Sequence, residues 1–370
     1  MAVMKITKIE TFHTQNLCVV RVTAEDGAVG WGQTAHNFTD ITCGIVHRML
    51  AKRVLGMDCE DIEAVNDLCI ESTYKFYGSF INRAAAGIDT ALWDMKARRA
   101  GKSVAQLLGA TRTKVDIYAS SMDKTITPQQ EADRMKRLKE EKGFRAFKLH
   151  IASGIGKDGD MYPGRTEEVV RLVRKAIGDD AELYVDPNGA YTVERAIELA
   201  GYFKEYNVGY FEEPCPFWEF EKSAAVAKAI DIPVAGGEQD YCLAQWQRII
   251  DAKAVAIAQP DICYIGGLTR ALRVSEMTKK AGLYCTPHNG TFNMLQVFSI
   301  HFNASIGNSH PFMEFSIDQN HLDPWTKDFF YPQVKIVDGK VDVPQEPGWG
   351  IHVSHDWLEK SAYTCSELNG

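Results

Sequence analysis

The sequence lacks the features of membrane, secreted and nucleic-acid-binding proteins. It has no apolar run of 18 or more residues, and its N-terminus, MAVMKITKIETFHTQ, lacks the apolar segment of a secretory signal. No stripe of Lys or Arg stands out, and the net charge of −8 at pH 7 disfavours binding to phosphate backbones. We therefore expect a cytoplasmic protein that binds neither membranes nor nucleic acids.

Paired metal-binding motifs are also missing. The nine cysteines are odd in number and include no C-x-x-C pair, which argues against a disulfide framework and a thiolate zinc site. We expect them to be reduced and mostly buried. The H-x-H pair of a zinc hydrolase is absent as well, because the only close histidines, His352 and His355, are separated by two residues.

The composition is that of a soluble globular protein, with 45% hydrophobic and 24% charged residues. At 370 residues the chain is too long for one ordinary core of about 100–200 residues. The length therefore predicts two domains, or one large barrel with additions.

The first 114 residues change from a strand pattern to a helical one. Alternating apolar and polar residues in KITKIETFHT, LCVVRVTAEDG and AVGWGQT predict an antiparallel meander, with a hairpin at Asp26-Gly27. From about Cys43 to Leu108 the pattern is helical, and NRAAAGIDTALWDMKARRAG predicts a helix that ends at Gly101.

Residues 115–317 have a different rhythm, in which short apolar runs alternate with helical segments of roughly 10–18 residues. Eight such runs alternating with helices favour an α/β fold of the (β/α) barrel type over an open sheet. Residues 318–370 lose the rhythm, and we expect them to pack back on the N-terminal part. The eight runs are VDIYAS, AFKLHI, ELYVDP, VGYFEEP, IPVAGGE, AVAIAQPD, LYCTPH and FMEFS.

Polar residues end seven of these eight runs, although buried strands are otherwise apolar. In a barrel the C-terminal strand ends form one rim, where catalytic groups lie. Several of the residues are 26 or 27 positions apart, about one β/α unit, so we expect them at equivalent heights on neighbouring strands. They are Lys148, His150, Asp186, Asn188, Glu212, Glu238, Asp261, His288 and Glu314.

Three carboxylates in register, Asp186, Glu212 and Glu238, would repel one another unless a cation lay between them. Oxygen ligands favour a hard ion, Mg²⁺ before Mn²⁺. A single carboxylate at such a position is more often a helix N-cap, but three in register are not. Glu213 is the alternative to Glu212, because adjacent strand residues face opposite sides.

Two further pairs suit proton transfer. Asp261 and His288 are typical of a base and the carboxylate that orients it, although a histidine satisfied within a turn is the alternative reading. Lys148 and His150 share parity on one strand, so both side chains are expected to point into the barrel. A neighbouring Lys and a divalent ion would keep the imidazole of His150 neutral.

Together these motifs resemble the enolase superfamily, and within it the mandelate racemase-like subgroup, over nearly the whole chain. The matching motifs are Asp186-Pro-Asn188, Glu212-Glu-Pro214, Gly237-Glu238, the Asp261 and His288 pair, Glu314, and the segment IDTALWDMKARRAGKSVAQLLG. The resemblance implies a (β/α)7β barrel, residues 115–317, and an α+β capping domain built from residues 1–114 and completed by residues 318–370.

The resemblance also implies the chemistry. Mg²⁺ held by Asp186, Glu212 and Glu238 would chelate a substrate carboxylate while a base removes the α-proton, and would stabilise the resulting ene-diolate. The subgroup usually has Lys-x-Lys on the second barrel strand, whereas this chain has Lys148-Leu-His150. His150 therefore replaces the usual base of that face, or acts as an acid.

Many proteins that resemble this pattern dehydrate acid sugars, removing the C2 proton and the C3 hydroxyl to give a 2-keto-3-deoxy acid. We thus expect a small-molecule sugar acid as substrate, with Glu314 and Asn188 near its carboxylate. Polar residues of two capping-domain loops, His13, His36 and Asn37, are candidates for its hydroxyls. A homo-oligomer, either a dimer or an octamer, is expected from the resemblance alone.

Other functions fit the same residues. A racemase, an epimerase or a sugar-lactone cycloisomerase would also use two opposed proton-transfer groups, and only the fate of the C3 or C4 oxygen distinguishes them. A metal-binding barrel without turnover, acting as a sensor or scaffold, is a remote alternative. It would not need His288, Asp261, Lys148 and His150 together.

Overall fold

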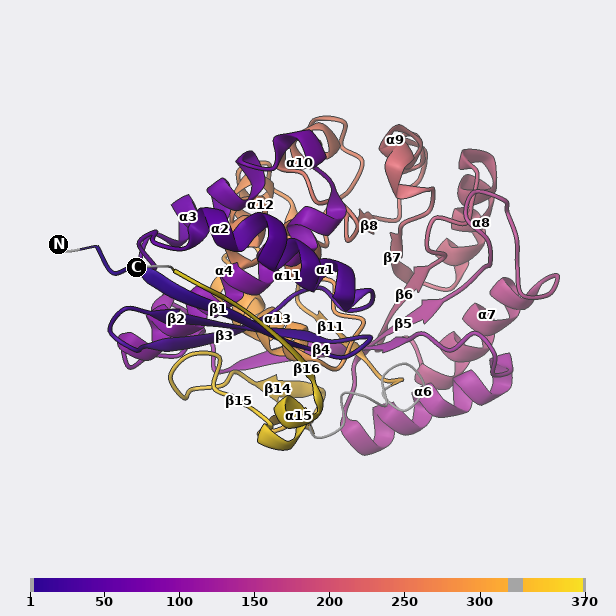
Figure 1. The fold of residues 1–370 in the computed structure, drawn as a ribbon. Helices are drawn as coiled ribbons and strands as arrows, with labels where there is room; N and C mark the ends of the chain where they lie inside the picture. Colours follow the sequence, from indigo (N-terminus) through magenta and orange to yellow (C-terminus); the bar gives the residue numbers. More distant parts are fainter. Residues whose placement is uncertain (1–2, 319–328, 369–370) are drawn as a thin grey trace.

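The computed structural model describes residues 3–318 and 329–368 of the chain. An α+β part built from the N-terminal residues lies against a barrel of parallel strands surrounded by helices (Figure 1). The predicted (β/α)7β barrel with an α+β capping domain is therefore confirmed.

The capping sheet is antiparallel, with the strand order β16-β1-β2-β3. Gly27 adopts a φ of +83° in the turn between β2 and β3, a conformation that favours glycine, so the hairpin predicted at Asp26-Gly27 is present. The last strand of the chain thus lies beside the first, and both termini lie on this part of the molecule (Figure 1). The four strands are β1 (Ile6–His13), β2 (Cys18–Ala24), β3 (Val29–Gln33) and β16 (Ala362–Glu367).

Helix α4 (Ser79–Arg99) packs across this sheet and ends two residues before Gly101, close to the predicted end. It approaches β3 so closely that a Cβ atom on Gly32 would lie 2.4 Å from the carbonyl oxygen of Gly87. Glycine is required there because the two backbones are in contact. The other helices of this part are α1 (Thr39–Ile45), α2 (Ala51–Val54), α3 (Ile62–Glu71) and α5 (Val104–Leu107).

The barrel contains all eight apolar runs as parallel strands in sequence order, and β11 closes it by pairing with β4. At the seam between β10 and β11, a parallel bridge joins Cys285 to Ser309. The strands are β4 (Lys114–Ser121), β5 (Ala146–His150), β6 (Glu182–Asp186), β7 (Val208–Glu212), β8 (Val234–Gly236), β9 (Ile257–Ala258), β10 (Tyr284–Cys285) and β11 (Met313–Ser316).

A helix follows each strand from β4 to β10, as the predicted alternation requires. Helix α6 shows how local sequence defines these elements: Thr127 and Gln130 form a capping box, Pro128 occupies the first turn, and Gly143 ends the helix with a φ of +72°. The barrel helices are α6 (Pro128–Lys142), α7 (Arg165–Ile177), α8 (Val193–Glu205), α9 (Phe220–Ala229), α10 (Leu243–Asp251), α11 (Ile262–Ile265), α12 (Leu268–Lys280) and α13 (Met294–Ser305).

The C-terminal residues contact both parts of the molecule. Strand β16 completes the capping sheet, whereas β14 (Lys340–Asp342) pairs with β13 (Ile336–Val337) and adds an antiparallel edge to β4 of the barrel. Strands β12 (Phe330–Tyr331) and β15 (His352–Val353) pair with each other, and α15 spans His355–Lys360. The division at residues 114 and 317 stays a prediction. None of the helices in the described ranges is long and apolar enough to cross a membrane.

Candidate active site

The barrel interior changes from apolar to polar near the C-terminal ends of the strands. One layer is built from Tyr118, Ala146, Tyr184, Tyr210 and Ile257, which form a buried apolar cluster. Alternate residues of a strand face the same side, so the residues two positions further point into the same interior. These are Ser120, Lys148, Asp186, Glu212 and Gln259, all buried. The sequence pattern thus places a polar layer directly on an apolar one.

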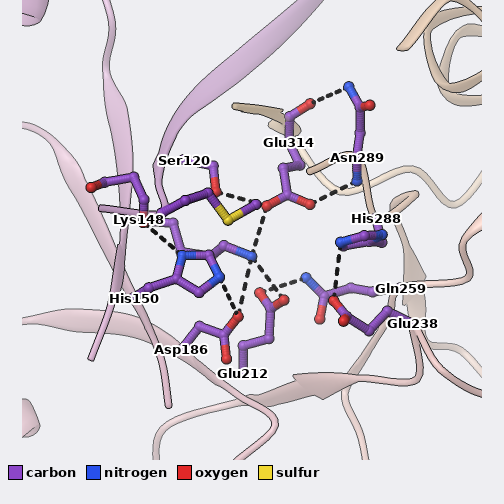
Figure 2. Close-up of polar contacts among 12 residues, drawn as sticks. Ser120, Lys148, His150, Asp186, Glu212, Glu238, Gln259, His288, Asn289 and Glu314 are labelled. Carbon is purple, nitrogen blue, oxygen red and sulfur yellow. Dashed lines mark hydrogen bonds and ion pairs between the residues drawn. The ribbon is translucent and has the colours of Figure 1, made fainter. Parts of the chain in front are cut away.

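Lys148 is the cation at the centre of the polar layer (Figure 2). Its Nζ atom lies 2.8 Å from Glu212 Oε1, 2.8 Å from Glu314 Oε1 and 3.6 Å from Asp186 Oδ2. Burial opposes the charge, but the three carboxylates outweigh it and hold the pKa of Lys148 well above its usual value. Lys148 is therefore a fixed positive charge that binds the carboxylates together.

Glu314 is ionised and fully hydrogen-bonded. Its Oε1 also accepts from Ser120 Oγ at 2.7 Å, and its Oε2 accepts from the backbone N–H of Asn289 at 2.7 Å. Burial opposes the ionised form, but Lys148 and then His288 lower the pKa of Glu314 to about 2. Glu314 is thus paired with Lys148 in the structure.

His288 and Asp261 form the predicted dyad. His288 Nδ1 lies 2.8 Å from Asp261 Oδ2, while Asp261 Oδ1 accepts the backbone N–H groups of Cys263 and Tyr264 at the start of α11. On the other side of the ring, His288 Nε2 lies 3.3 Å from Glu238 Oε2. Burial lowers the pKa of His288, but Glu238 and Asp261 reverse this and raise it well above its usual value.

His150 is held at the end of β5. Its Nδ1 lies 2.6 Å from the carbonyl oxygen of Ser121, and its Nε2 lies 3.1 Å from Asp186 Oδ2. A carbonyl oxygen only accepts hydrogen bonds, so Nδ1 carries a hydrogen and Nε2 is the atom next to the carboxylate. The side chains of Lys148 and His150 therefore both point into the barrel, as predicted, and both lie next to Asp186.

The three predicted metal ligands end β6, end β7 and follow β8, but each carboxylate also has protein partners. Glu212 Oε2 accepts from Gln259 Nε2 at 2.8 Å, and Glu238 Oε1 accepts from Gln239 Nε2 at 3.0 Å. Glu238 reaches the site because Gly236 and Gly237, with φ values of +157° and +106°, turn the chain after the strand. In the described part of the chain, one group of three or more His, Cys, Asp or Glu residues has ligand atoms that all lie within 4.8 Å of one another, and it is an exposed trio elsewhere: His355, Asp356 and Glu359.

The charges of the cluster nevertheless fit a divalent cation. Burial, Asp186, Glu314 and Glu238 together raise the pKa of Glu212 to about 8, although Lys148 opposes them. The neighbouring Glu213 has a φ of +35° and a buried Oε1 that has no hydrogen-bond partner among the described residues. Burial and Glu238 raise the pKa of Glu213 well above its usual range. An all-oxygen donor set with excess negative charge suits Mg²⁺. The ligand set, and the choice between Glu212 and Glu213, stay predictions.

A cavity of about 360 Å³ adjoins the cluster, a volume in the usual range for small-ligand sites. Six predicted residues line it: His36, Asn37, His150, Asn188, Glu238 and His288. Asn188 also donates its backbone N–H to Asp186 Oδ1 at 2.6 Å. Burial lowers the pKa of His36 to about 4, so this ring is neutral at pH 7 and can hydrogen-bond a hydroxyl group.

His13 lies in another cavity. That cavity has a volume of about 790 Å³ and contains Asn37 as well, together with Gln15, Asn16 and Lys360. A loop at the end of β1 therefore reaches the neighbourhood of the catalytic cavity without lining it. The substrate contact proposed for His13 from the sequence stays a prediction that the structure leaves without support.

Several residues of the site were missed in the sequence. Gln259 and Ser120 contact the carboxylates, and alternation along the strands could have identified both, because each lies two positions beyond an apolar interior residue. Other residues lie on loops, where no periodicity applies. The cavity residues in this class are Met122, Lys124, Gly290 and Thr291, while Tyr264 lines the cavity from the short helix α11.

Two family models match the chain and together cover most of it. The model described as mandelate racemase / muconate lactonizing enzyme, N-terminal domain, matches residues 3–109. The model described as enolase C-terminal domain-like matches residues 130–357. The two matches correspond to the capping part and to the barrel with part of the C-terminal segment.

Individual relatives cover nearly the full length. The arabinonate dehydratase of Saccharolobus solfataricus is 27% identical over 95% of this chain and 92% of its own. A solved structure from Roseobacter denitrificans, described as a candidate racemase, is 44% identical with a TM-score of 0.97, covering 99% of this chain and 100% of that one. A mandelate racemase/muconate lactonizing protein from Paracoccus denitrificans, complexed with magnesium, is 26% identical with a TM-score of 0.88 and covers 98% of both chains.

Proposed function

The chain belongs to the mandelate racemase and muconate lactonizing enzyme family of the enolase superfamily, and on that basis we propose that it is a magnesium-dependent acid-sugar dehydratase. The substrate is an aldonate or an aldarate. The reaction removes the proton from C2 and the hydroxyl group from C3, and the enol product becomes a 2-keto-3-deoxy acid.

One observation carries this proposal: two histidines from different strands line the same cavity. Dehydration needs a base for the C2 proton and an acid for the leaving hydroxyl, and each contributes typically 10²–10⁴-fold to the rate. His288 comes from the loop after β10 and is oriented by Asp261, whereas His150 ends β5 and is oriented by the carbonyl of Ser121. One histidine takes the C2 proton, and the other protonates the departing C3 oxygen.

The remaining residues hold the substrate and the charges. Asn188 and His36 line the cavity with polar side chains that can bind hydroxyl or carboxylate oxygens. Lys148 and Glu314 lie below the cavity as an ion pair and keep the carboxylate cluster in place. Both are fully buried, so their role is to position other groups.

Asp186, Glu212 and Glu238 would hold the magnesium ion. When bound, the ion supplies Lewis-acid stabilisation of the negative charge that develops on the substrate carboxylate. The magnesium in the related Paracoccus protein supports this choice of metal, as does the all-oxygen donor set of this chain.

The test is a screen of aldonates and aldarates with Mg²⁺, in which 2-keto acids are detected by the absorbance of their semicarbazones. The wild type should form a 2-keto acid from at least one compound. His288→Asn and His150→Asn should each lower kcat by about 100-fold or more. The matched control is His355→Asn, because His355 is exposed on α15, outside the cavity, and this variant should keep wild-type turnover.

Two results would contradict the proposal. One is the absence of 2-keto acid from every acid sugar in the panel. The other is wild-type turnover by both the His288 and the His150 variants, which would remove these residues from the proton transfers.

A racemase or epimerase is the second candidate, and the 44% identical structure described as a candidate racemase favours it. The same two histidines would then exchange the C2 proton without loss of the C3 hydroxyl. Incubation in deuterated water separates the two reactions. Deuterium at C2 of recovered substrate without 2-keto acid indicates epimerisation, whereas accumulation of 2-keto acid indicates dehydration.

A further inference from the structure

Lys124 is a cation in the catalytic cavity without a protein partner. It lines the cavity together with His150 and Asn188, and no hydrogen bond or ion pair joins its Nζ atom to another described residue. Its side chain is about half buried, and burial lowers its pKa, although Asp186 opposes this effect. A partly desolvated ammonium group without a counterion is an unsatisfied binding group for an anion.

The backbone around Lys124 is held by one hydrogen bond to a distant residue and by one hydrogen bond within its own turn. The N–H of Met122 donates to Asp318 Oδ2 at 2.6 Å, and the N–H of Thr125 donates to Asp123 Oδ1 at 2.8 Å. The loop after β4 therefore presents this one long cationic side chain from a fixed position. An anchored loop loses little conformational entropy when a ligand binds to it.

Lys124 comes from the loop that follows β4, beyond the strand residues that contact the catalytic layer. The last residues of β4 contact that layer, through Ser120 Oγ to Glu314 and through the Ser121 carbonyl to His150. Lys124 is the third residue after the end of β4 at Ser121, so its Cα atom lies within about 10 Å of the strand end. Lys148, by contrast, is fully buried and occupied by carboxylates. Of these two lysines, Lys124 is therefore the one that is available to a ligand.

The cavity also has polar groups without partners for uncharged oxygens. Thr291 is buried, and its Oγ1 has no hydrogen-bond partner among the described residues. The neutral ring of His36 lines the same cavity. Hydroxyl groups along a polyol chain would satisfy such donors and acceptors, while a charged end would satisfy Lys124.

We propose that Lys124 binds a second anionic group of the substrate, a terminal carboxylate or phosphate, so that the enzyme selects acid sugars with a negative charge at both ends. This inference rests on the proposed function and specifies its substrate class. An acid sugar with a neutral terminal hydroxymethyl group would leave Lys124 unpaired in the complex.

The experiment compares three six-carbon compounds of matched stereochemistry in the presence of Mg²⁺: an aldarate, an aldonate and a 6-phosphoaldonate. The measured quantity is the ratio of kcat/KM for each doubly charged compound to kcat/KM for the aldonate. In Lys124→Met the ratio for the preferred doubly charged compound should fall about 10- to 100-fold, because a hydrogen bond between charged groups is lost. Whichever ratio falls identifies the carboxylate or the phosphate as the second anion.

The matched control is Lys136→Met on the exposed face of α6, which should leave the ratios unchanged. An equal loss for all three compounds in Lys124→Met would overturn the inference, because Lys124 would then bind the carboxylate they share. Unchanged ratios would overturn it as well. If the wild type forms no 2-keto acid, the proposed dehydration is wrong, but the role of Lys124 can still be tested. Calorimetry then measures the binding of the three compounds to the wild type and to Lys124→Met. Equal affinities of the two proteins for the doubly charged compounds would refute the proposed role of Lys124.

Discussion

Replacing Lys148 by Met removes the positive charge that holds the carboxylate cluster together. Met has a similar length, so the main change is electrostatic. Two ion pairs of 2.8 Å, to Glu212 and to Glu314, are lost, and both carboxylates stay buried. Hydrogen bonds to charged groups contribute about 1.5–3 kcal/mol each. Breaking a buried ion pair costs about 3–5 kcal/mol, so we expect the free energy of unfolding to fall by about that amount.

The loss of stability in Lys148→Met should depend on pH in a defined direction. In the wild type Lys148 and His288 hold the pKa of Glu314 at about 2, whereas without Lys148 the burial of Glu314 raises its pKa in the folded variant above the value of about 4.3 expected in the unfolded chain. The pKa of Glu212, already about 8 in the wild type, rises further. Above that pH the unfolded chain has released protons that the folded variant retains, so the variant becomes less stable as the pH rises. The destabilisation relative to wild type should therefore be larger at pH 8 than at pH 5.5.

Equilibrium urea unfolding, followed by tryptophan fluorescence in magnesium-free buffer, measures both effects. Lys204→Met is the control, because Lys204 pairs with Asp231 on the surface and both side chains are mostly exposed. Its stability should stay within about 0.5 kcal/mol of wild type. A loss below about 1 kcal/mol for Lys148→Met at pH 8, or a loss that grows on acidification, would refute the electrostatic account.

Three further predictions concern metal binding, a buried arginine and a buried acid. Mg²⁺ at 100 times its dissociation constant should stabilise the wild type by about 2.7 kcal/mol, which is measured as a higher melting temperature. Glu238→Gln should reduce this shift in melting temperature. An unreduced shift in the variant would show that Glu238 is not a ligand. Arg174 donates hydrogen bonds to four carbonyl oxygens, those of Gly178, Ala181, Tyr206 and Asn207. Arg174→Met should therefore lower the free energy of unfolding in urea by about 2–4 kcal/mol. The control is Arg171→Met on the exposed face of the same helix, which should change it little. Burial raises the pKa of Asp89 from 3.8 to about 7, so the unfolded chain loses this proton first and the free energy of unfolding falls by about 3 kcal/mol as the pH rises from 4 to 7. Asp89→Asn should lack this component, and identical pH profiles for the two proteins would contradict it.

Much of the barrel and its polar rim could be predicted because both follow from periodic patterns. Eight apolar runs at regular spacing gave the strands, and alternation along each strand gave the inward direction of Lys148, Asp186 and Glu212. The dyad of His288 and Asp261 could be predicted for the same reason, because Asp261 follows β9, His288 follows β10, and these two strands are neighbours in the barrel. These predictions depend on local geometry that every parallel barrel shares.

Loop residues could not be predicted in this way. Lys124 and Thr291 line the cavity from loops, whereas His13, the last residue of β1, and the polar loop that follows it line a different cavity. Short sequence patterns do not encode the path of a loop, which depends on contacts with distant residues such as the hydrogen bond from Met122 to Asp318.

By itself the sequence determined the order of the elements, the residues that face the barrel interior and the concentration of carboxylates at one rim, because repeating side-chain patterns act over neighbouring residues. Only the tertiary structure decided which carboxylate oxygens each cation contacts and which polar loop residues reach the cavity. It also decided that Glu238, which follows two glycines with positive φ, lies next to His288. These arrangements arise from electrostatic and steric contacts between residues far apart in the chain, and such contacts exist only once the barrel has closed.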